Sequence, residues 1–218
     1  MRGLFRNNFY ATLLSAKAFT GIALLVGVFV VAMDNAIPSL IIGYMLLVMI
    51  GFSLNSIASI RKESATKWGK YKLTVPVRKR DIVSSFFASQ LLWLAVGIVF
   101  AGTGIALSIA LHGNPFDRNT DIFMLFVVGI GVSLFMGAIF FPLYFLGGEE
   151  RSEVTLMVSL LGGIGVVMGL TTLINIMYPG NMTTWQIVLS GIFMMACGAA
   201  AFAVSCPISV GVFRRKEY

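Results

Sequence analysis

The chain has 218 residues, of which 58% are hydrophobic and only 11% are charged. Soluble domains usually carry about 25% charged residues, so the composition excludes an ordinary water-soluble fold and favours a membrane protein with several spans. The net charge is +7, but the basic residues lie in short clusters between long apolar segments, which makes nucleic-acid binding a poor explanation of that charge.

Residues 1–17 come first and are too polar to span a membrane. Apolar residues recur in them at helical spacing, at Phe5, Phe9, Leu13 and Ala16. This pattern predicts an amphipathic helix that lies in the membrane interface and leads into the first span. The alternative is a disordered basic tail.

Six apolar segments follow, and each is about long enough to cross the roughly 30 Å of hydrocarbon in a bilayer. Strands of a membrane β-barrel would alternate apolar and polar residues, whereas these segments are apolar on all sides. The sequence therefore predicts an all-α polytopic membrane protein, with an N-terminal interfacial helix and a six-helix transmembrane domain over residues 18–218. The predicted spans are 18–33, 39–60, 82–111, 122–146, 154–177 and 185–212.

The distribution of Lys and Arg predicts the orientation, because short cytoplasmic loops carry an excess of them. If the N-terminus is cytoplasmic, fifteen of the sixteen basic residues lie on the cytoplasmic side and only Arg118 lies outside. We therefore expect both termini to face the cytoplasm.

The loop of residues 61–81, between the second and third spans, carries eight of these basic residues. Trp68 and Tyr71 lie three residues apart, so on a helix they would share one face. Pro76 ends that helix, and a basic segment then begins the third span. The loop is expected to form a compact cytoplasmic feature; the alternative is that its basic residues only fix the topology and its aromatic residues only anchor it at the interface.

Two further features concern later spans. Glu149, Glu150 and Arg151 form a charged trio between spans four and five, which is either a contact site for a partner or a solvated loop. Small residues four apart, Gly165 with Gly169 and Ala196 with Ala200, predict faces on which helices approach closely. Packing within the chain is the default expectation for these faces, and packing between two chains is the alternative.

The chain lacks the residues that several other functions need. It contains no Gly-x-x-x-x-Gly-Lys-Ser/Thr sequence, so no phosphate-binding loop is predicted. Four ionisable residues, Asp34, His112, Asp117 and Asp121, are expected in or beside the outer loops rather than within spans, which argues against ion-coupled transport. His112 is the chain's one histidine and has no partner, which argues against a metal site. An intramembrane enzyme would need paired carboxylates, a Ser–His or Ser–Lys set, or metal ligands within the spans, and none is present.

The segment from Glu63 to Val83, with its Trp, Tyr and Leu-Thr-Val-Pro-Val-basic-basic pattern, resembles a signature of ABC-2-type transporter permeases. A second match is the run 141–151, in which a Pro-Leu-Tyr-Phe segment is followed by Gly, acidic and basic residues. The resemblance implies two permease subunits that work with two cytoplasmic ATPase subunits. It assigns ATPase coupling to Glu63, Lys67, Trp68, Tyr71, Pro76 and Arg80, and a smaller second contact to Glu149, Glu150 and Arg151.

Within that family the chain is most similar to the small permease subunits of phenol-soluble modulin exporters. This resemblance implies a protein of the bacterial plasma membrane, in contact with membrane lipid, that exports amphipathic or hydrophobic substrates, in particular membrane-active peptides such as phenol-soluble modulins. Resistance to antimicrobial peptides would be a consequence. The resemblance implies no catalytic activity and no cofactor in this chain, since ATP and Mg²⁺ would bind the partner ATPase. The competing hypothesis is a membrane scaffold or sensor that binds a partner protein without moving a substrate.

Overall fold

The computed structural model describes residues 2–33, 39–65, 79–113, 116, 118–148, 151–178 and 182–215. These residues contain no strand, and their helices are all long and apolar enough to cross a membrane. The prediction of an all-α protein with six spans is confirmed. The described helices are α1 (Arg2–Met33), α2 (Ser39–Ala65), α4 (Lys79–His112), α5 (Asn119–Gly147), α6 (Ser152–Met177) and α7 (Thr184–Arg215).

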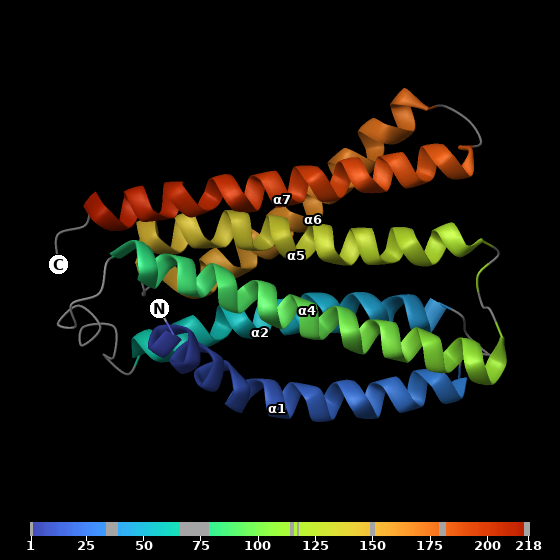
Figure 1. The fold of residues 1–218 in the computed structure, drawn as a ribbon, viewed down its shortest axis with the longest axis horizontal. Helices are drawn as coiled ribbons and strands as arrows, with labels where there is room; N and C mark the ends of the chain where they lie inside the picture. The colour runs from blue at the N-terminus through green and yellow to red at the C-terminus, as the bar shows by residue number, and fades with distance from the viewer. Residues whose placement is uncertain are drawn as a thin grey trace.

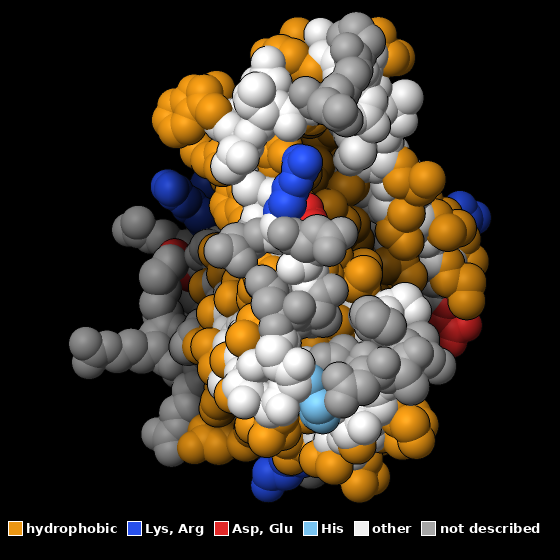
Figure 2. Space-filling view, turned by 90° about the vertical axis from the view of Figure 1, so that its right-hand side faces the viewer, with side chains coloured by type: hydrophobic (Ala, Val, Ile, Leu, Met, Phe, Trp, Pro, Cys, Tyr) orange, Lys and Arg blue, Asp and Glu red, His pale blue; other side chains and the backbone are white. Residues whose placement is uncertain are grey.

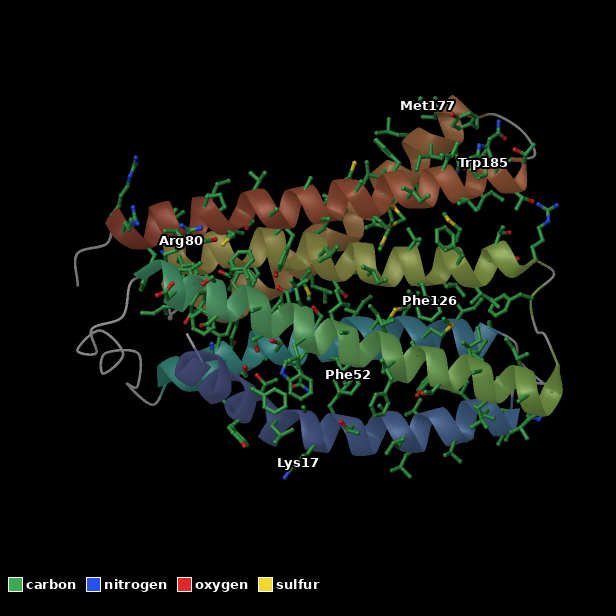
Figure 3. The ribbon with its side chains drawn as sticks, viewed as in Figure 1. Lys17, Phe52, Arg80, Phe126, Met177 and Trp185 are labelled. Atoms are coloured by element: carbon green, nitrogen blue, oxygen red, sulfur yellow. The ribbon has the colours of Figure 1, made fainter. Side chains whose placement is uncertain are left out.

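The first helix continues without a break from the predicted interfacial segment into the first span. No proline interrupts residues 2–33, and Figure 1 shows that α1 changes direction along its length while remaining one helix. The apolar part that could span the membrane, Ser15–Met33, starts three residues before its predicted position. Lys17 is exposed and points away from the bundle (Figure 3).

The helices run alongside one another as an elongated bundle (Figure 1). The start of α1, the end of α2, the start of α4 and the end of α7 lie at the same end of that bundle. Because most Lys and Arg residues belong to the segments at this end, we call it the basic end. Arg80 marks it in Figure 3, and Met177 and Trp185 mark the opposite end.

The six helices form two groups. In the N-terminal group, α1, α2 and α4 pack on one another, and α1 contacts no helix outside this group among the described residues. In the C-terminal group, α5 packs extensively on both α6 and α7, which scarcely contact each other. The groups meet mainly where α2 lies against α5, with smaller contacts of α4 with α5 and α7. Helix α5 is therefore central to the bundle.

Aromatic side chains fill the core near the basic end. The Phe87 ring of α4 lies 4.1 Å from that of Phe141 on α5 and 4.9 Å from that of Phe202 on α7, measured between ring centroids. Such offset aromatic pairs stabilise a core beyond the apolar area that they bury. These rings supply part of the apolar contact between the two groups.

The outer surface is largely apolar, as expected for helices surrounded by lipid. Figure 2, which looks at the opposite end, shows hydrophobic side chains around the rim and few charged ones. Helix α6 is the least covered helix, since it packs mainly on α5. Its outer half exposes a series of large apolar side chains: Met168, Leu173, Ile176 and Met177.

Candidate functional site at the basic end of the bundle

The basic end gathers the ends of helices that flank the predicted coupling segments. Glu63 lies in the last turn of α2, and Arg80 is exposed in the first turn of α4. Arg151 is exposed directly before α6, and this helix starts at the same end of the bundle (Figure 1). The remaining predicted coupling residues lie outside the described residues: Lys67, Trp68, Tyr71, Pro76, Glu149 and Glu150.

A glycine pair makes the turn from α5 towards Arg151. Gly148 caps α5 with φ 75° and ψ −175°, a conformation that residues with a Cβ scarcely adopt. Its N–H donates a hydrogen bond to the Tyr144 carbonyl and so satisfies one of the free carbonyls at the helix end. The Gly-Gly sequence at 147–148 therefore ends α5 sharply at the basic end.

Below this surface, buried polar side chains join the three helices of the N-terminal group. Asn8 donates to the Ser85 hydroxyl at 2.9 Å, and the hydroxyls of Thr12 and Ser59 share a hydrogen bond of 2.7 Å. A third hydrogen bond, of 3.3 Å, joins Ser56 and Ser89. We call these side chains, together with Ser53 and Gln90, the polar seam: Asn8, Thr12, Ser53, Ser56, Ser59, Ser85, Ser89 and Gln90.

The polar seam fixes how the helices of the N-terminal group sit against one another. All its members are buried, so each unmade hydrogen bond would leave a polar atom in an apolar environment. Hydrogen bonds between membrane helices contribute only about 0.6 kcal/mol each on average. Their directionality nevertheless favours one register between α1, α2 and α4 at the end where α2 and α4 lead into the predicted coupling loop.

Gln90 extends the polar seam to the C-terminal group. Its side chain is only 1% exposed, and its amide Nε2 donates to the Ser53 hydroxyl on α2 at 3.2 Å and to the Ser133 carbonyl on α5 at 2.9 Å. The amide lies directly against Gly137, where a Cβ would collide with it. The amide oxygen is buried and has no hydrogen-bond partner within the described chain.

An aromatic stack lies next to the polar seam. The Trp93 ring is stacked between Phe9 of α1, at a centroid distance of 5.5 Å, and Phe52 of α2, at 6.1 Å. Phe9, one of the apolar residues that predicted the interfacial helix, lies against Trp93 of α4. The N-terminal part of α1 therefore belongs to the packed bundle through its apolar and polar residues alike.

The sequence analysis missed the small-residue face that packs the two groups together. Gly129, Ser133 and Gly137 lie four residues apart on α5 and are all buried. Gly129 is covered by the Met49 side chain, and Gly137 by the Gln90 amide, as described above. The signal was present in the sequence, because this Gly-x-x-x-Ser-x-x-x-Gly run is longer than the pairs that were singled out.

The small-residue pairs that were predicted lie on exposed faces instead. A Cβ added at Gly165 or Gly169 would meet no atom within 4 Å, so in the described chain these glycines pack against no other helix. Ala196 and Ala200 are exposed on α7. The close approach of α6 to α5 within the chain occurs instead at Gly163, where a Cβ would lie 3.0 Å from the backbone of α5. Packing of the predicted faces between two chains stays a prediction.

The described residues contain no group of three His, Cys, Asp or Glu side chains that could hold a metal ion. No charged side chain is buried in the part of the chain that the structure describes. At the basic end, the described chain presents the exposed Arg80 and Arg151 at the surface, with the buried polar seam below them.

Comparison with known proteins matches the chain to a family of membrane proteins. The family model described as ABC-2 family transporter protein matches residues 3–214. No curated protein and no solved structure matches the chain. The match covers all six described helices almost completely.

Proposed function

The chain belongs to the ABC-2 family of membrane transporters, and we propose that this permease subunit exports amphipathic, membrane-active peptides from the bacterial cytoplasm, powered by a separate ATPase. The observation that carries the proposal is the family match over residues 3–214, which coincides with six helices able to cross a membrane. The family supplies the transport role, and the residues of this chain support the partner and the substrate.

A separate ATPase is supported by what the sequence lacks and by the geometry of the basic end. The sequence contains no phosphate-binding loop, so ATP and Mg²⁺ would bind another chain. Glu63 lies in the last turn of α2 and Arg80 in the first turn of α4, so the loop that carries Trp68 and Tyr71 starts and finishes at the basic end. Arg151 lies at the same end and would add the second contact, together with Glu149 and Glu150. This end is the proposed docking surface for the ATPase.

A second permease subunit is supported by the exposed face of α6. Helix α6 packs mainly on α5 and leaves Gly165 and Gly169 uncovered. Small residues on an exposed membrane helix allow the backbone of a second helix to approach closely. A second permease, identical or related, would use this face or that of Ala196 and Ala200 on α7.

The substrate class is supported by the composition of the spans. They contain many of the chain's 18 Phe and 12 Met residues, and no charged side chain is buried among the described residues. Apolar surfaces rich in flexible Met side chains adapt to ligands of varied shape. The resemblance to permeases of phenol-soluble modulin exporters points to the same class, and resistance to antimicrobial peptides would follow from it.

The test is to purify the chain together with the ATPase encoded by the neighbouring gene and to measure ATP hydrolysis in lipid nanodiscs. We expect a short amphipathic helical peptide to stimulate hydrolysis, and a scrambled peptide of the same composition, which has no apolar face, to have little effect. Stimulation by a polar solute alone would contradict the peptide substrate but not the ATPase partner. If no ATPase co-purifies, the competing role as a scaffold or sensor is favoured.

The predicted orientation is tested with single cysteines at Ser64 and Asn119, after Cys197 and Cys206 have been replaced by alanine. Ser64 belongs to the last turn of α2 at the basic end, and Asn119 begins α5 at the opposite end. We expect a membrane-impermeant maleimide to label Asn119→Cys in intact cells, and to label Ser64→Cys only after the membrane is permeabilised. The reverse pattern would show that the basic end faces outwards.

A further inference from the structure

We propose that Gln90 is the positioning residue through which the N-terminal group of helices moves the C-terminal group when the ATPase acts on the basic end. This inference rests on the proposed ATPase partner, but it concerns a residue within the membrane bundle and needs no knowledge of the substrate. Gln90 lies between the two groups and contacts both α2 and α5.

The N-terminal group is built to move as one body at the basic end. Its three helices are joined there by side-chain hydrogen bonds from α1 to α4, from α1 to α2 and from α2 to α4. The Phe9–Trp93–Phe52 stack joins the same three helices a short distance further along. A displacement of the loop between α2 and α4 would therefore be carried by α1, α2 and α4 together.

The surfaces through which the two groups meet resist sliding less well than the hydrogen-bonded contacts within the N-terminal group. Where α2 and α4 face α5, Gly129 and Gly137 contribute no side chain of their own; the flexible Met49 side chain covers the first and the Gln90 amide the second. The neighbouring contact of Phe87 with Phe141 is made by two aromatic rings and contains no hydrogen bond. A directional hydrogen bond is the interaction that fixes register across such a contact.

Gln90 supplies that directional link. One amide nitrogen donates both to the Ser53 hydroxyl, in the N-terminal group, and to the Ser133 carbonyl, in the C-terminal group. The Ser133 carbonyl belongs to the backbone of α5, so Gln90 is hydrogen-bonded to the main chain of this helix and not to a mobile side chain. Because α6 and α7 both pack on α5, a shift of α5 would be passed to the whole C-terminal group.

Stability alone does not account for a glutamine at this position. Its amide oxygen is buried and lacks a hydrogen-bond partner within the described residues, which is unfavourable in an apolar interior. Methionine has nearly the same length and shape and would remove the unpaired amide oxygen, at the cost of the hydrogen bond that the Ser53 hydroxyl accepts. The glutamine is explained if its link between the groups is what the position requires.

Two variants break this link from opposite sides. Gln90→Met removes both hydrogen bonds and keeps the packing volume. Gly137→Ala leaves Gln90 in place, but the new Cβ occupies the space of its amide and forces this flexible side chain to turn away. Ser56→Ala is the matched control, because it removes a hydrogen bond of the polar seam that lies entirely within the N-terminal group.

The experiment is hydrogen–deuterium exchange of the permease–ATPase complex in nanodiscs, compared without nucleotide and after trapping with ATP and vanadate. In the wild type and in Ser56→Ala, we expect trapping to change exchange in peptides from both groups of helices. In Gln90→Met and in Gly137→Ala, we expect the change to persist in α1, α2 and α4 and to be lost in α5, α6 and α7. A melting temperature close to that of the wild type should show that both variants are folded.

Two results would overturn the inference. If the C-terminal group of both variants responds to trapping as in the wild type, Gln90 does not carry the motion. If only Gln90→Met loses the response while Gly137→Ala keeps it, the effect belongs to the substituted side chain and not to the link. A wild-type complex in which neither group responds would instead refute the ATP-driven complex itself, and this inference with it.

Discussion

Replacing Gly163 by leucine is expected to separate α6 from α5 and to prevent the chain from folding into a monodisperse protein. A Cβ at this position would lie 3.0 Å from the Met136 nitrogen and from the Val132 carbonyl oxygen. Both atoms belong to the backbone of α5, so they cannot turn away as a side chain would. Overpacking of this kind costs about 1–3 kcal/mol and occasionally more, and α6 has few other contacts to compensate for it.

The matched control is Gly165→Leu, two residues further along the same helix. Both variants add the same side chain to α6, but nothing lies within 4 Å of a Cβ at Gly165. We expect Gly163→Leu to lower the melting temperature in detergent and to elute as aggregate in size-exclusion chromatography. Gly165→Leu should elute without aggregate as a folded protein, as a monomer if the second permease packs on this face. Equal loss in the two variants would mean that helix propensity or lipid contact, and not the approach of α6 to α5, sets the effect.

The second large effect is expected from Trp68→Ala combined with Tyr71→Ala in the proposed coupling loop. Aromatic anchors that contribute 2 kcal/mol or more dominate many protein interfaces. A combined loss of about 2–4 kcal/mol corresponds to roughly 30-fold to nearly 1,000-fold weaker binding of the ATPase. The double variant should therefore fail to retain the ATPase during purification while still inserting into the membrane.

The chain offers a control pair of the same residue types at the opposite end. Tyr178 is 43% exposed and directly follows Met177, and Trp185 is 70% exposed. Met177 and Trp185 lie at the opposite end of the bundle from Arg80 (Figure 3). We expect Tyr178→Ala combined with Trp185→Ala to leave ATPase binding unchanged in the same pull-down. If the double variant at Trp68 and Tyr71 also binds normally, those residues serve only to anchor the loop at the membrane surface.

The sequence predicts the helices well because the signal for a membrane span is local. A span is recognised from the apolar residues of its own segment and does not depend on the neighbouring helices. The predicted span 154–177 therefore differs from the observed Ser152–Met177 by only two residues at its start. The two predicted coupling segments follow span two and span four. The chain has crossed the membrane an even number of times before each of them, so both lie at the same end of the bundle.

The contacts between helices were not predictable in the same way, because they depend on which face of each helix is covered. Gly163 and Gly165 look alike in the sequence, yet one lies against the α5 backbone and the other is uncovered. Gln90 and its serine partners are polar residues scattered through apolar segments, and nothing local indicates that they meet. The resemblance to a family indicated where the ATPase would bind, and it gave no information on this interior.

The division of the bundle into two groups has a consequence for how the chain is made. Proteins emerge from the ribosome N-terminus first, and folding units generally form in that order. All the helices that α1 contacts have been synthesised once residue 112 is complete, so the polar seam can close before α5 exists. Helix α5 then provides the surface on which α6 and α7 dock separately, since those two scarcely touch. The order of synthesis thus matches the order in which most of these contacts can form: α1 has all its partners once α4 is complete, and the smaller contact of α4 with α7 is added when the last helix arrives.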